Sequence, residues 1–121
     1  MFKPLLMVGL LAASPVMAQP GAADRHHYAA GQAATVDFSL QERSPRGGRT
    51  TSIYRTYRPN VSFDGGPRVE CVVAVPGGGG VAPGTTRRIT LTCPVPLREG
   101  QTFEAFERDR PVGTGVVTAP L

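Results

Sequence analysis

The stretch from Val69 to Pro96 constrains the fold most, because it contains two apolar strand patterns that each carry one cysteine. The alternating apolar faces consist of Val69, Cys71, Val73 and Val75 in the first pattern, and of Ile89, Leu91 and Cys93 in the second. An antiparallel pairing of Cys71 with Cys93 also places Val73 opposite Leu91. Cross-strand neighbours lie roughly 4.5–5.5 Å apart, which suits a disulfide. We therefore predict an antiparallel hairpin closed by a Cys71–Cys93 disulfide.

The first 18 residues have the pattern of a secretory signal peptide. Lys3 provides the positive charge, Leu5 to Ala13 form a short apolar core, and Val16-Met17-Ala18 is a typical cleavage site. The apolar run is far shorter than the roughly 20 residues that span a membrane. We predict cleavage after Ala18, with no transmembrane segment left in the exported chain. The protein is then periplasmic or secreted, where two cysteines most simply form one structural disulfide. The alternative, a redox pair, lacks a C-x-x-C motif.

Residues 19–121 contain 12 arginines, 9 acidic residues and no lysine, a formal net charge of +3. This charge is too small to indicate nucleic-acid binding by itself. The only histidines, His26 and His27, are adjacent, and Asp24 alone does not complete a metal site with them. We predict no bound metal and no cofactor.

No segment has a helical period, and glycine or proline recurs every few residues. We expect a flexible leader over residues 19–34 and one all-β domain over residues 35–121. The clearest strand is 35–40, in which Val36, Phe38 and Leu40 share one face. The remaining β-prone stretches are 50–57, 61–63, 69–75, 87–93, 101–107 and 112–118, with turns at 64–67, 98–100 and 108–110. Short strands at this spacing predict a sandwich or a small closed barrel.

Three motifs in order add a family resemblance. They are Gly47-Gly48-Arg49 with Thr51 and Tyr57-Arg58-Pro59; then Val81-Ala82-Pro83-Gly84; then Glu99-Gly100, Phe103 and residues 110–117, RPVGTGVV. Together they resemble the C-terminal, third domain of translation elongation factor Tu over about residues 33–120. The resemblance implies a six-stranded antiparallel β-barrel.

The chain departs from that family in ways that bear on function. It has no G-x-x-x-x-G-K-[ST] phosphate loop, so we expect no GTP binding or hydrolysis. The family's threonine-rich segment after the YRP strand is replaced by Asp64-Gly65-Gly66-Pro67, and the two cysteines are not part of the family pattern. With a signal peptide in front, these features indicate an exported relative of the barrel with no role in translation.

A cluster of arginines and tyrosines is the main candidate binding site. It consists of Arg43, Arg46, Arg49, Thr51, Tyr54, Arg55, Tyr57 and Arg58. Guanidinium groups suit phosphate or carboxylate, and tyrosine rings can stack on bases or sugars. In elongation factor Tu the loop that matches Gly47-Gly48-Arg49 approaches transfer RNA, which gives Arg49 and Thr51 a claim to an anion-facing position. The alternative is that these are ordinary solvated side chains.

Other polar groups do not indicate catalysis. Glu104, Glu107 and Asp109 fall in or near a terminal hairpin turn, where solvated charge is expected, and no serine has a histidine partner in the folded domain. The run from Gly77 to Gly80 reads as a flexible hairpin loop, and Arg87-Arg88 as charged residues that protect a strand from aggregation. We therefore predict a non-catalytic binding or structural module with a protein partner in the cell envelope. The alternative is an anion-binding module for polysaccharide, lipid headgroup or nucleic acid.

Overall fold

The computed structural model describes residues 25–120, all of which form β-structure, turns and loops without a helix. The predicted signal peptide, residues 1–18, lies outside the described residues, as do residues 19–24. No helix in the described range is long and apolar enough to cross a membrane. The strands are β2 (His27–Tyr28), β3 (Ala33–Leu40), β4 (Asn60–Phe63), β5 (Arg68–Glu70), β6 (Val72–Ala74), β7 (Thr86–Thr92), β8 (Leu97–Arg98), β9 (Thr102–Glu107) and β10 (Arg110–Val117).

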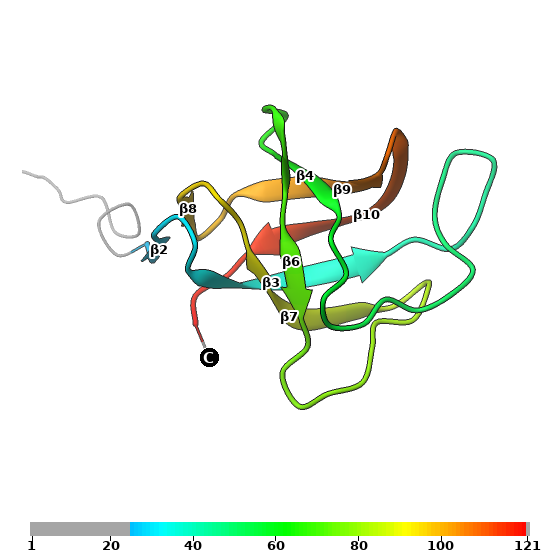
Figure 1. Ribbon diagram of the computed structural model, residues 1–121, viewed down its shortest axis with the longest axis horizontal. Coiled ribbons are helices and arrows are strands. Elements are labelled where there is room, and N and C mark those ends of the chain that lie inside the picture. Colours follow the sequence, from blue (N-terminus) through cyan, green and yellow to red (C-terminus); the bar gives the residue numbers. More distant parts are fainter. Residues whose placement is uncertain (1–24, 121) are drawn as a thin grey trace, which may run out of the picture.

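Seven strands form one antiparallel sheet in the order β5-β4-β9-β10-β3-β7-β6, and the sheet curls into a nearly closed barrel (Figure 1). Its two end strands, β5 and β6, are consecutive in the chain and flank Cys71. Across the seam, the Cys71 N–H donates to the Pro59 carbonyl at 3.0 Å and the Val73 N–H to the Tyr57 carbonyl at 2.8 Å. The prediction of a small antiparallel barrel is confirmed. The seventh strand arises because the predicted strand 69–75 bends at Cys71 into two short strands.

The core of the barrel follows from alternation along the strands. Val36, Phe38 and Leu40 of β3 are buried, as the pattern predicted for 35–40, and Ala34, which was assigned to the leader, is buried as well. Burying a valine, leucine or phenylalanine side chain stabilises a fold by about 1.5–3 kcal/mol. Other strands supply the remaining core, including Val61, Val73, Ile89, Leu91, Ala105, Val112 and Val117. Because apolar side chains fill the interior, any binding surface must be formed by polar groups and loops on the outside of the barrel.

The cysteine hairpin has the register that the sequence predicts. Val73 of β6 lies opposite Leu91 of β7, and Val72 lies opposite Thr92. Cys71 and Cys93 form a disulfide with their Cα atoms 4.4 Å apart, and both are buried. The bond therefore links β7 to the chain where β5 gives way to β6, at the seam of the barrel.

Two expectations about local structure were wrong. Residues 50–57 form bends and turns rather than a strand, with one isolated bridge between Ile53 and Val81. Thr56 has a φ of 70°, which an extended strand cannot contain. The described part of the predicted leader is also docked on the barrel. There β2 pairs with β8, Tyr28 is 3% exposed, and its hydroxyl donates to the Thr118 carbonyl at 2.7 Å.

Candidate functional site

The long loop over residues 41–59, between β3 and β4, projects from the barrel beside the turn that joins β9 and β10 (Figure 1). Gly48 fixes its position, because its N–H donates to the Pro111 carbonyl at 2.9 Å. The φ of Gly48 is +83°, and a Cβ there would lie 2.0 Å from the Glu42 carbonyl oxygen. Only glycine tolerates both conditions. The loop backbone is therefore packed against the start of β10.

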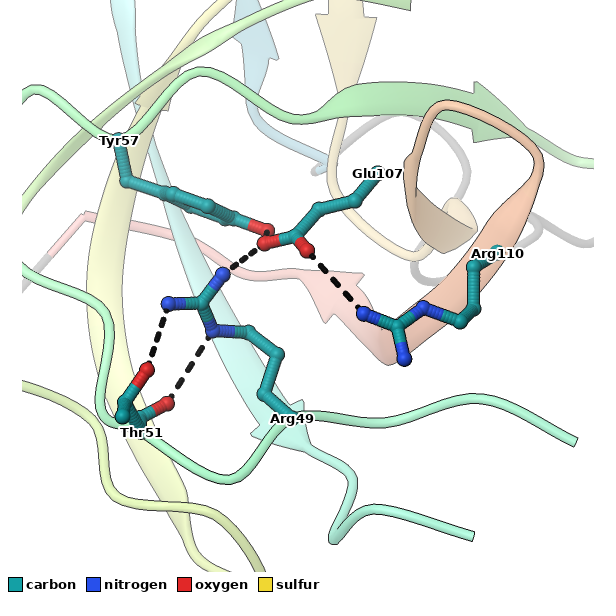
Figure 2. A network of polar contacts seen from close by, with 5 residues as sticks. All are labelled: Arg49, Thr51, Tyr57, Glu107 and Arg110. Carbon is teal, nitrogen blue, oxygen red and sulfur yellow. Dashed lines mark hydrogen bonds and ion pairs between the residues drawn. The ribbon is translucent and has the colours of Figure 1, made fainter. Parts of the chain in front are cut away.

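Glu107, at the end of β9, holds the loop through its side chain (Figure 2). One oxygen, Oε2, accepts hydrogen bonds from the Arg49 guanidinium and, at 2.5 Å, from the Tyr57 hydroxyl. The other oxygen, Oε1, lies 3.7 Å from a guanidinium nitrogen of Arg110. Arg49 also donates to the carbonyl and the hydroxyl of Thr51, at 3.1 and 2.9 Å. Five side chains from the loop and the terminal hairpin are thus connected through the Glu107 carboxylate and the Arg49 guanidinium.

The surroundings of Tyr57 shift the pKa of its hydroxyl group. Burial and the hydrogen bond to Glu107 raise the pKa of the Tyr57 hydroxyl well above its ordinary value of 10.0, and the nearby Arg49 lowers it. The Arg49 guanidinium lies 5.1 Å from the centre of the Tyr57 ring, so it covers an aromatic face as well. Arg49, Thr51 and Tyr57 therefore act chiefly to position the loop, since their polar groups already have partners.

An open groove lies between this loop and the turn after β9. Its volume is about 840 Å³, and it is lined by Pro45, Arg46, Pro111 and residues 107–110. A smaller depression of about 160 Å³ adjoins it, shares Glu107 and Arg110, and adds Arg43, Arg49, Thr50 and Thr51. Five arginines line the two hollows against two carboxylates, Glu107 and Asp109. We call this surface the arginine groove.

The predicted arginine–tyrosine cluster does not form one face. Arg43, Arg46, Arg49 and Thr51 line the arginine groove. Tyr54 lies elsewhere, with its ring against Gly80, where an added Cβ would come within 2.7 Å of a ring carbon. Arg55 and Arg58 are exposed, and neither lines the arginine groove.

The glycine run beside Tyr54 is more ordered than its sequence suggests. Arg87 donates from its guanidinium to the carbonyls of Pro76, Gly78 and Gly80 at 3.1, 2.8 and 3.0 Å. A loop predicted to be flexible is thus held by one side chain from β7. Arg88 instead donates to Asp37 at 2.9 and 3.2 Å, which lowers the pKa of that carboxyl group.

Sequence reasoning missed the partners of the cluster. Glu107, Arg108 and Arg110 were assigned to a solvated turn, yet they form one wall of the arginine groove. A usable signal existed, because a two-residue turn at 108–109 pairs residues 107 and 110 and gathers four charged side chains. The contact between Arg49 and Glu107 spans 58 residues and gave no comparable signal.

The fold and this groove define a small β-barrel domain with one disulfide, an arginine-lined groove and, in its described residues, a core without buried charge. No group of three or more histidine, cysteine, aspartate or glutamate residues in the range 25–120 could hold a metal ion. No protein-family model matches the chain.

Proposed function

We propose that this protein is an exported, non-catalytic binding module that uses its barrel as a rigid scaffold for a protein partner in the cell envelope. The observation that carries the proposal is the exposure of Tyr54. It is the one large apolar side chain exposed among residues 25–120, with 58% of its surface accessible. Tyrosine is enriched at protein interfaces, where its ring supplies contact area at a low cost in side-chain entropy.

The surroundings of Tyr54 favour a protein partner. Its ring rests on Gly80, at the end of the glycine run that Arg87 holds. Gly77 and Gly78 are exposed and have open space where a Cβ would be, so another chain can approach their backbone closely. A rigid aromatic ring beside accessible backbone suits recognition of another chain, because little ordering is needed on binding. We call Tyr54 and Gly77–Gly80 the tyrosine–glycine surface.

Three further features support an exported and non-catalytic role. The buried Cys71–Cys93 disulfide suits an oxidising compartment such as the periplasm or the medium. The barrel and the ordered motifs suggest descent from the third domain of elongation factor Tu, with the chain serving here outside translation and without GTP. Glu107 and Asp109, the acids that line the arginine groove, are paired with arginines rather than poised for proton transfer.

The test is quantitative crosslinking of the exported chain, residues 19–121, to proteins of its own cell envelope. We expect one main partner, captured by the wild type at high and low salt and lost with Tyr54→Ser. Thr114→Ser is the matched control, because it also places serine at an exposed position, on β10. Equal capture of the partner by Tyr54→Ser would contradict the role of this surface.

A second candidate function is anion binding, and the arginine groove is the observation that favours it. Its five arginines exceed its two carboxylates by three positive charges. Retention of the purified protein on a sulfated matrix at low salt, lost steeply as salt rises, is the expected result. A protein that passes through such a matrix at low salt does not have this function.

A further inference from the structure

We propose that the arginine groove binds an anionic polysaccharide chain, with Arg46 and Arg108 as the principal ligands for its sulfate or carboxylate groups. This inference rests on the second candidate function and names its ligand class. It also moves the site away from the predicted cluster, because one of its two main residues lies in the turn between β9 and β10.

Arg46 and Arg108 are chosen because Arg49 and Arg110 of the groove already have an acidic partner. Arg49 is engaged by Glu107 and Thr51, and Arg110 shares the same carboxylate. Arg46 and Arg108, by contrast, have no acidic partner within ion-pair distance in the part of the chain that the structure describes. Both are exposed and line the groove from opposite walls. A ligand therefore gains charge-assisted hydrogen bonds from them without breaking an existing ion pair.

The backbone conformation of Arg108 supports the same choice. Its φ is +55°, at the first position of a two-residue hairpin turn where glycine is usual. A non-glycine residue in this conformation carries backbone strain. The turn conformation does not itself favour arginine, and the exposed Arg108 side chain is available to a ligand.

The shape and lining of the groove favour a chain over other anions. A volume of about 840 Å³ is far larger than a single phosphate or sulfate needs, and adjoining space continues towards Arg43. The rings of Pro45 and Pro111 give the groove apolar surface against which sugar rings can pack. The ligand should therefore be extended and carry several anionic groups.

Two alternative ligands fit less well. A flat anionic membrane would contact only the exposed rim of the groove, where the fully exposed side chain of Asp109 is already paired with Arg68 at 3.3 Å. A single-stranded nucleic acid gains much of its affinity from aromatic rings on which its bases stack. The ring of Tyr57 is covered by Arg49, its hydroxyl is bound to Glu107, and Tyr54 does not line the groove.

The experiment compares Arg108→Gly with wild type, using heparin as the sulfated probe and polygalacturonate as the carboxylated one. Glycine removes the cation and also relieves the backbone strain, so the melting temperature should stay equal or rise. Affinity should fall about fivefold to tenfold, and the slope of log K against log salt should decrease by about one. Binding and stability are thus expected to move in opposite directions, which a general loss of structure cannot produce.

Two further variants complete the test. Arg46→Ala, on the other wall, should weaken binding by a similar factor. Arg98→Ala, which removes an exposed arginine of β8, changes the net charge equally and should leave affinity within about twofold.

Each other outcome overturns a specific claim. If the wild type binds neither probe, anion binding as a function fails. If it binds but Arg108→Gly and Arg46→Ala behave like Arg98→Ala, the groove is not the site although anion binding stands. Tighter binding to phosphatidylglycerol vesicles or to single-stranded DNA than to both polysaccharides overturns the ligand class.

Discussion

At the residue scale, Glu107 connects the two candidate surfaces to the barrel. Its carboxylate is shared by Arg49, Tyr57 and Arg110, so one side chain sets both the conformation of the 41–59 loop and the charge left in the groove. Half-buried networks of this kind specify geometry well, because a partner removed from them leaves another charge uncompensated. The loop is therefore positioned before any ligand arrives.

Tyr57 allows this network to be tested by pH. Its pKa is raised in the folded protein, mainly by burial and then by Glu107. A raised pKa means that the stability from Tyr57 is complete below the unfolded value of about 10 and is lost as the pH rises above it towards the folded value. In urea unfolding between about pH 8 and pH 11, the unfolding free energy of the wild type should fall more steeply above pH 10 than that of Tyr57→Phe. The difference in slope should reach about 1.4 kcal/mol per pH unit. Identical slopes would mean that Tyr57 is not held protonated by its surroundings.

At the element scale, the 41–59 loop depends on close packing of glycine as much as on its ion pairs. Gly48 and Gly77 have almost the same φ, +83° and +82°, but only Gly48 has backbone atoms where a Cβ would lie. Gly77→Ala should cost about 1 kcal/mol from the backbone conformation alone. Gly48→Ala adds a clash with the Glu42 carbonyl and should cost about 2–4 kcal/mol in total. Urea unfolding of the pair measures the packing contribution directly, and equal losses would show that the loop backbone at Glu42 relaxes around the added Cβ.

The same element shows what could and could not be predicted from the sequence. The alternation of residues 35–40 and the matched faces of the cysteine hairpin are local signals, and both predicted strands formed with the expected buried sides. The stretch 50–57 is also rich in β-formers, but its path is set by distant partners, Glu107 for Tyr57 and Gly80 for Tyr54. Intrinsic strand propensity is too weak to oppose such contacts. The division of the predicted cluster into two surfaces follows from this, because neighbours in sequence were assumed to share a face.

At the scale of the whole molecule, the disulfide joins the places where the barrel closes. Cys71 lies between β5 and β6, the two ends of the sheet, and its N–H bonds to Pro59, where the 41–59 loop ends. Loosening this seam should weaken both the barrel and the anchorage of the loop.

The double variant Cys71→Ala/Cys93→Ala tests this coupling. The two cysteines are 22 residues apart, and loss of the bridge should destabilise the protein by about 3 kcal/mol on the chain-entropy model. Thiol titration of the intact protein should detect no free thiol, and reductant should lower the wild-type unfolding free energy towards that of the double variant. The double variant itself is the control, because reductant should not change its stability. If reductant leaves the wild type as stable as before, the bridge does not secure the seam, and the barrel is closed by its hydrogen bonds and apolar core alone.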